Sequence, residues 1–165
     1  MGTKSEQLQI RISSAEKAAL KQRAAAAGMG LSAYVLSRAL PPGRDRLAEL
    51  VVSLSQTERA GRSYVLAELN DFLAGLAGFE LADAVERADL AALDPYLRNY
   101  VAAMVEQACY LRGVASPAWA SEVSPLEEPR FATDLESLRP HLLRESPVPF
   151  KRRNIFIDAS IGDRV

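Results

Sequence analysis

Cysteine and histidine are almost absent from this sequence of 165 residues, and so are the motifs of common enzymes. Cys109 is the only cysteine, which excludes an internal disulfide and favours a reducing, cytoplasmic compartment. His141 is the only histidine, so the sequence holds no Cys/His cluster with metal-ligand spacing. It also holds no Gly-rich phosphate loop and no G-x-S-x-G nucleophile motif. We therefore expect a protein that is not an enzyme, with no catalytic residues, no metal and no cofactor.

Long apolar runs are missing as well, and none approaches the ~20 residues that a membrane-spanning helix needs. The first seven residues lack the apolar stretch of a secretory signal, so we expect neither export nor a membrane partner. Aromatic residues make up 7% of the chain and hydrophobic residues 48%, with many Ala and Leu. This composition predicts a mainly α-helical protein with a real core.

Charge is spread unevenly although the net charge is only −1. Residues 1–46 hold eight Lys or Arg against three Asp or Glu, a net charge of +5. Residues 47–146 hold eight Arg against sixteen Asp or Glu, a net charge of −8, and residues 147–165 return to +2. A basic N-terminal segment followed by an acidic one is typical of a chain whose N-terminal part binds a polyanion. Chance asymmetry of charge on a solvated surface would look the same.

Residues 7–13 alternate between polar and apolar side chains, which is typical of a half-buried β-strand. An ordinary edge strand with a solvated polar face would show the same pattern. One face of the strand would carry Leu8, Ile10 and Ile12, and the other Gln7, Gln9 and Arg11.

Two helices are predicted directly after this strand. Ser13 and Glu16 form a capping-box signature for a helix start, and Gly28 can supply the left-handed residue that ends the helix. Ser32 is the expected N-cap of a second helix, which ends at Pro41. A strand and two helices in about 40 residues bury too little surface alone, so the pattern predicts a homodimer with a two-stranded ribbon.

The segment of about residues 5–41 resembles the ribbon-helix-helix family of MetJ-, Arc- and CopG-like repressors and antitoxins. The resemblance rests on the alternating residues 7–12, the helix start at residues 13–16 and the Gly28–Tyr34 turn. It implies that the polar face of the ribbon enters the major groove of double-stranded DNA at an inverted repeat. It further implies base contacts by Gln7, Gln9 and Arg11, and phosphate contacts at the start of the second helix by Ser32, Ala33 and Tyr34.

Beyond the Pro41-Pro42-Gly43 boundary, apolar spacing predicts helices at about 45–55, 63–76, 81–87 and 95–112. Prolines recur from position 117 onwards, which favours extended chain with one short helix at about 135–145. The predicted organisation is a ribbon-helix-helix domain (1–42), a helical body (43–114) and an extended Pro-rich segment that docks on a partner (115–165).

The region from about Tyr96 to Arg164 is similar to antitoxin-like proteins encoded beside nucleotidyltransferase toxins of the AbiE type. The similarity rests on YLRGV, Pro117-Ala118-Trp119, Pro129-Arg130-Phe131 and the stretch from Ser146 to Ile157. It implies a protein partner, a toxin, although the same segment would equally well pack on its own body. The predicted partner-binding residues are Phe150, Lys151, Arg152, Arg153 and Phe156.

Three functions remain open from these residues. The first is an antitoxin that represses its own promoter and neutralises a toxin. The second is an accessory DNA-binding protein of plasmid mobilisation, because some relaxosome proteins have a ribbon-helix-helix head and a helical body. The third is a stand-alone transcriptional regulator. The sequence does not define the operator, the partner or an oligomer larger than a dimer.

Overall fold

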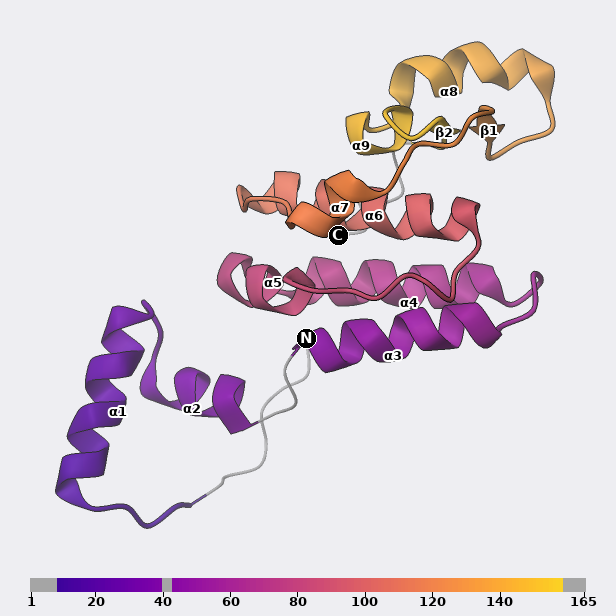
Figure 1. Ribbon diagram of the computed structural model, residues 1–165. Coiled ribbons are helices and arrows are strands. Elements are labelled where there is room, and N and C mark those ends of the chain that lie inside the picture. The colour runs from indigo at the N-terminus through magenta and orange to yellow at the C-terminus, as the bar shows by residue number, and fades with distance from the viewer. Residues whose placement is uncertain (1–8, 40–42, 159–165) are drawn as a thin grey trace. The chain divides into compact units, whose positions relative to one another are not determined.

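The computed structural model describes residues 9–39 and 43–158 (Figure 1). The chain forms two compact units, Met1–Pro41 and Pro42–Val165, which we call the head and the body. Most described residues of both units are helical, as the composition predicts. None of the helices among them is long and apolar enough to cross a membrane.

The head contains helix α1 (Ser14–Ala26), which begins at the predicted capping box. The hydroxyl of Ser13 accepts a hydrogen bond from the Glu16 amide (3.2 Å), and the Ser13 amide donates to Glu16 Oε2 (2.7 Å). The hydrogen bonds that the Ser13 amide and hydroxyl donate to the Glu16 carboxylate lower its pKa. The residues alone therefore locate this helix start correctly.

Helix α1 ends at the predicted glycine. Gly28 has a φ of +67°, a left-handed conformation that glycine adopts without strain. The amide of Met29 donates to the Ala24 carbonyl (2.9 Å), and that of Gly28 donates to the Ala25 carbonyl (3.0 Å). This pair of bonds is a Schellman motif, which satisfies carbonyls at the helix end.

Replacing Ser13 by alanine should destabilise the head by about 1 kcal/mol, the usual effect of losing a serine N-cap. Urea unfolding followed by circular dichroism measures this change. Ser14→Ala is the matched control, because Ser14 is the first residue of α1 and follows the cap. Equal stability of the Ser13→Ala variant and the wild type would contradict the role of the cap.

The second helix of the head, α2 (Leu31–Ala39), begins one residue before the predicted N-cap Ser32. The amide of Tyr34 donates to the carbonyl of Gly30 (2.9 Å), so Ser32 lies inside the first turn. Gly30 takes the cap position because it follows the Schellman turn directly and glycine is itself an acceptable cap. The two helices pack together, and Ala24 and Tyr34 are buried.

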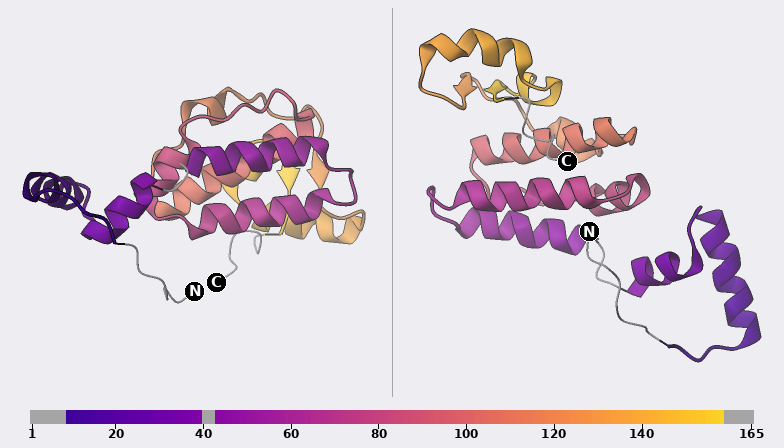
Figure 2. Two further views of the ribbon diagram at one scale, coloured as in Figure 1. Left: turned by 90° about the horizontal axis from the view of Figure 1, so that it is seen from below. Right: turned by 180° about the vertical axis from the view of Figure 1, so that it is seen from behind.

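The body begins with an antiparallel pair of helices, α3 (Gly43–Gln56) and α4 (Arg62–Gly75), which lie side by side (Figure 2). Helix α5 (Gly78–Val85) also packs on α3. The approach of α3 to α5 is close at Gly43, where a Cβ atom would lie 2.7 Å from the Cβ of Ala84. The three predicted helices exist, with ends that differ by one to three residues.

Helix α6 (Pro95–Arg112) occupies the middle of the body, between α4 and α5 on one side and α9 (Val148–Lys151) on the other (Figure 1). Its bounds are those predicted from the Asp94-Pro95 start and the Gly113 stop. The carboxylate of Asp94 caps the helix by accepting from the Leu97 amide (2.9 Å). Half of its 18 residues are buried, as expected for a central helix: Leu97, Asn99, Tyr100, Val101, Ala102, Ala103, Met104, Val105 and Cys109.

Residues 118–158 form short helices and a pair of short strands, and the helices Ala118–Glu122 and Val148–Lys151 pack on α6, so the predicted extended segment is wrong for this part of the chain. The physical reason is burial, because Phe150, Ile155 and Ile157 belong to the same core as α6. The elements are α7 (Ala118–Glu122), β1 (Arg130–Phe131), the 3₁₀ turn η1 (Glu136–Leu138), α8 (Arg139–Glu145), α9 (Val148–Lys151) and β2 (Ile155–Phe156).

Strands β1 and β2 form a parallel pair, with Arg130 opposite Ile155 and Phe131 opposite Phe156. The rings of Phe131 and Phe156 stack with their centroids 4.9 Å apart. The hydroxyl of Ser146 accepts from the amide of Ile157 (2.8 Å) next to this pair. Strand β2 and Ile157 are therefore attached to β1 and Ser146 by backbone hydrogen bonds, an aromatic contact and a hydroxyl contact.

Candidate nucleic-acid interface

Residues 9–13 of the predicted ribbon strand are described, and they form no strand in the single chain. The side chains of Ile10 and Ile12 are 59% and 43% exposed. A ribbon strand needs a second chain to pair its backbone groups, so one chain alone leaves these two isoleucines without cover. The strand itself stays a prediction.

Two of the three predicted base-reading residues lie in the described part of the chain. Gln9 and Arg11 both have exposed side chains, and they alternate with Ile10 and Ile12. A Gln amide can pair with adenine and an Arg guanidinium with guanine in the major groove. The third, Gln7, lies outside the described residues.

The predicted phosphate contacts fall on the first turn of α2. The amides of Leu31, Ser32 and Ala33 precede Tyr34, whose amide is the first to donate within the helix, so the helix itself offers them no acceptor. The amide of Tyr34 already donates to Gly30, and its side chain is buried. The expected phosphate contact by the Tyr34 amide is therefore wrong, and Leu31 joins Ser32 and Ala33 in its place because the helix begins one residue earlier than predicted.

The five predicted partner-binding residues do not form one surface. Phe150 is 1% exposed and Phe156 is also buried, since both pack within the body. Arg152 is exposed, and Lys151 is half-buried with its ammonium group donating to the carbonyl of Arg144 (2.6 Å). Arg153 is 4% exposed and lies inside the body. Binding of a partner by these residues stays a prediction.

Arg153 ties three parts of the body together. Its guanidinium donates to the Glu106 carboxylate on α6 (2.9 Å) and to the carbonyls of Val123 (3.1 Å) and Ala120 (2.5 Å). It also lies 3.4 Å from the side-chain oxygen of Asn99. These bonds give the buried charge an ionic partner and several acceptors, which is what a charge away from water requires.

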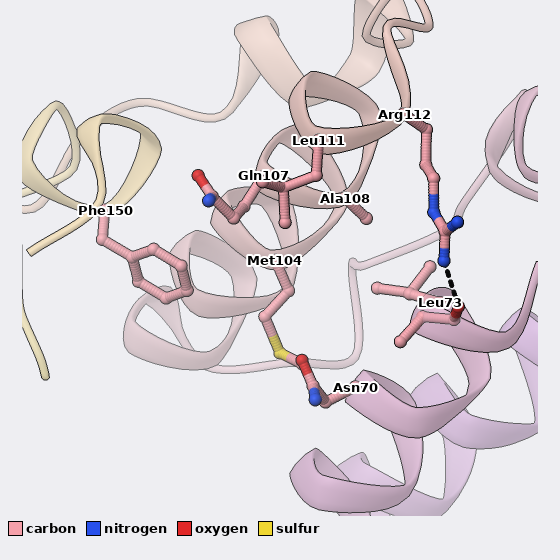
Figure 3. Close-up of a pocket in the computed structure, with 9 residues that line it drawn as sticks. Asn70, Leu73, Met104, Gln107, Ala108, Leu111, Arg112 and Phe150 are labelled. Carbon is pink, nitrogen blue, oxygen red and sulfur yellow. Dashed lines mark hydrogen bonds between the residues drawn. The ribbon is translucent and has the colours of Figure 1, made fainter. Parts of the chain in front are cut away.

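A pocket between α4 and α6 was not foreseen, because its walls come from helices distant in the sequence (Figure 3). It measures about 170 Å³, and Arg112 closes one side by donating to the carbonyl of Ala74. The lining offers amide and guanidinium groups but no nucleophile and no general acid or base. It consists of Asn70, Leu73, Ala74, Met104, Gln107, Ala108, Leu111, Arg112 and Phe150.

Comparison with known proteins finds a match at the N-terminal end of the chain, which holds the candidate DNA-binding residues. Residues 2–61 match the model of a NikA-like family, described as mobilization protein NikA, which is a ribbon-helix-helix DNA-binding protein. No curated protein and no solved structure matches the chain. The match covers the head and α3, and it supports a DNA-binding segment of ribbon-helix-helix type. It lends no support to a link with antitoxins or AbiE-type toxins.

Proposed function

We propose that the protein is a dimeric DNA-binding protein of plasmid mobilisation, the second of the three functions that the sequence left open. The observation that carries the proposal is the match of residues 2–61 to NikA-like mobilization proteins. Ile10 and Ile12, which alternate with Gln9 and Arg11, lie within this match and are exposed. They provide the apolar face that a second chain would cover in a ribbon. The antitoxin function stays a prediction that nothing in the match supports.

Dimerisation is the first step of the proposed mechanism. Two copies of residues 7–13 pair as an antiparallel ribbon, and Ile10 and Ile12 turn towards the helices of both chains. Covering side chains of this size contributes about 1.5–3 kcal/mol each, which supplies the free energy that a single chain lacks. The two-fold symmetry of the dimer then selects an inverted repeat.

DNA recognition is the second step. The ribbon enters the major groove with Gln9 and Arg11 towards the base edges, and the first turn of α2 directs its amides at the backbone phosphates. The head's net positive charge supplies an additional attraction that does not depend on sequence. We propose no reaction for the protein itself; its role is to hold DNA for other components of mobilisation.

Arg11→Ala should reduce the preference for the specific site over random DNA by about 1–3 kcal/mol, because one base-reading group is lost from each chain. Fluorescence anisotropy with specific and random duplexes at one salt concentration measures this preference. Arg23→Ala is the matched control, since Arg23 is an exposed residue of α1 and its loss changes the charge equally. An unchanged preference in the Arg11→Ala variant would exclude the proposed base contact.

The biological role is tested by the location of the bound site. Footprinting on DNA that surrounds the gene should protect an inverted repeat beside a transfer origin or a relaxase gene. Protection restricted to the promoter of a toxin gene would instead favour the antitoxin function and overturn the mobilisation role.

A further inference from the structure

We propose that the body binds an extended, positively charged peptide segment of a partner protein in a groove beside the start of α6. The groove measures about 740 Å³, within the range of pockets that hold ligands. It runs between the α5–α6 connection (residues 88–95) and the loop that follows α7 (residues 122–130), with Trp119 in its lining. It lies entirely in the body, so the proposal does not depend on DNA binding by the head.

The loop after α7 is fixed in place by side chains of the body. Asn99 donates to the carbonyl of Ser124 (3.0 Å), Arg153 donates to that of Val123 (3.1 Å), and Asn154 donates to that of Leu126 (2.6 Å). Asn99 and Arg153 are themselves buried. A wall held in this way loses little conformational freedom when a ligand binds, which favours affinity.

The opposite wall is fixed in the same manner. The guanidinium of Arg98 donates to the carbonyls of Leu93 (2.7 Å) and Ala91 (3.1 Å). The indole nitrogen of Trp119 donates to the carbonyl of Val85 (2.8 Å), which fixes the ring against α5. Arg98 keeps its charge, but these bonds direct its N–H groups at the backbone.

The charged groups that remain at the groove are mostly carboxylates. Glu122, Glu127 and Glu128 are exposed, and no ion pair holds them within the part of the chain that the structure describes. Arg130 is the opposing charge, besides the bonded Arg98. With three exposed carboxylates against Arg98 and Arg130, the lining has a net charge of −1, which favours cations over polyanions such as DNA.

Between the carboxylates the groove is apolar. Leu90 is buried in its lining, and Trp119, Val123 and Leu126 are partly buried there. An aromatic and aliphatic surface framed by carboxylates fits a chain that alternates Lys or Arg with apolar side chains. That composition defines the partner segment.

Trp119 is the only tryptophan of the chain, so its fluorescence reports on this groove alone. The probe is the peptide acetyl-Lys-Leu-Arg-Lys-Leu-Arg-amide, titrated into the full-length protein. We expect a saturable change in Trp119 emission, and none with acetyl-Glu-Leu-Asp-Glu-Leu-Asp-amide. Glu127→Gln together with Glu128→Gln should weaken binding by about tenfold or more, because two attractive charges are lost.

The matched control is Glu58→Gln with Asp71→Asn, which removes two exposed carboxylates outside the groove lining. It should change the peptide affinity by less than about twofold, because both charges are solvated. The proposal is overturned if the basic peptide leaves Trp119 emission unchanged, if both double variants lose affinity equally, or if single-stranded DNA competes for the groove. A lower oligomer mass of the Glu127→Gln/Glu128→Gln variant in sedimentation would assign the groove to a second copy and equally overturn it.

Discussion

Replacing Ile10 by lysine should abolish dimerisation and lower the affinity for specific DNA by at least about a thousandfold. In the proposed ribbon, residue 10 faces the helices of both chains, so the dimer would bury two unpaired ammonium groups. Each costs several kcal/mol, which exceeds what the remaining apolar contacts of a small head supply. Sedimentation gives the mass, and fluorescence anisotropy gives the DNA affinity.

Gln9→Lys is the control that separates charge from position. It adds the same charge one residue away, on the face that the ribbon turns towards DNA, so the dimer should persist. The fluorescence of Trp119 should be unchanged in both variants, because Trp119 belongs to the body. If the Ile10→Lys variant stays dimeric and binds its site as the wild type does, the ribbon model and the proposed function both fail.

Replacing Arg153 by methionine should destabilise the body by about 3–5 kcal/mol. The change leaves the carboxylate of Glu106 in a largely buried position without its cation, which is the costly way to break a buried ion pair. It also removes donors from the carbonyls of Ala120 and Val123, so α7 and the loop after it each lose one of their attachments to the core.

Urea unfolding followed by Trp119 fluorescence measures this loss. Arg152→Met is the matched control, since Arg152 is exposed and its loss should change stability by less than about 0.5 kcal/mol. The double variant Arg153→Met with Glu106→Met should recover much of the loss, because no buried charge remains. Equal stability of the Arg153→Met and Arg152→Met variants would contradict the structural role of Arg153.

Cys109 offers a second readout for the same series. It is fully buried, and burial raises the pKa of its thiol. A thiol reagent cannot reach the buried thiol, and the raised pKa leaves little of the reactive thiolate. The reagent should therefore react only when the body opens. Faster labelling of Cys109 in the Arg153→Met variant than in the Arg152→Met variant would show the opening directly.

The elements that the sequence predicts well are those defined by local chemistry. The Ser13–Glu16 capping box and the Asp94-Pro95 start lie within four residues of chain, and so do the glycine stops at Gly28 and Gly113. Each signal is complete in the sequence because all its atoms are neighbours along the chain.

The ribbon strand is predicted from alternation alone and cannot be observed in one chain, because in the proposed dimer its hydrogen-bonding partner is another molecule. The burial of residues 150–153 could not be predicted from the sequence for a different reason. Lys151, Arg152 and Arg153 look equivalent as a basic run, but the buried one is chosen by Glu106, 47 residues away. The prolines predicted extended chain, but Pro140 and Pro149 lie at the starts of helices α8 and α9, where their fixed φ is favourable.

The parallel pairing of β1 with β2 and the burial of Ile157 have a consequence for synthesis of the protein. Helices α3 to α6 cannot complete their core until Phe150, Ile155 and Ile157 have been translated and placed against them. Until that point the nascent body exposes an apolar face that a chaperone can hold. A product truncated before residue 150 keeps that face exposed and becomes a natural substrate for proteolysis.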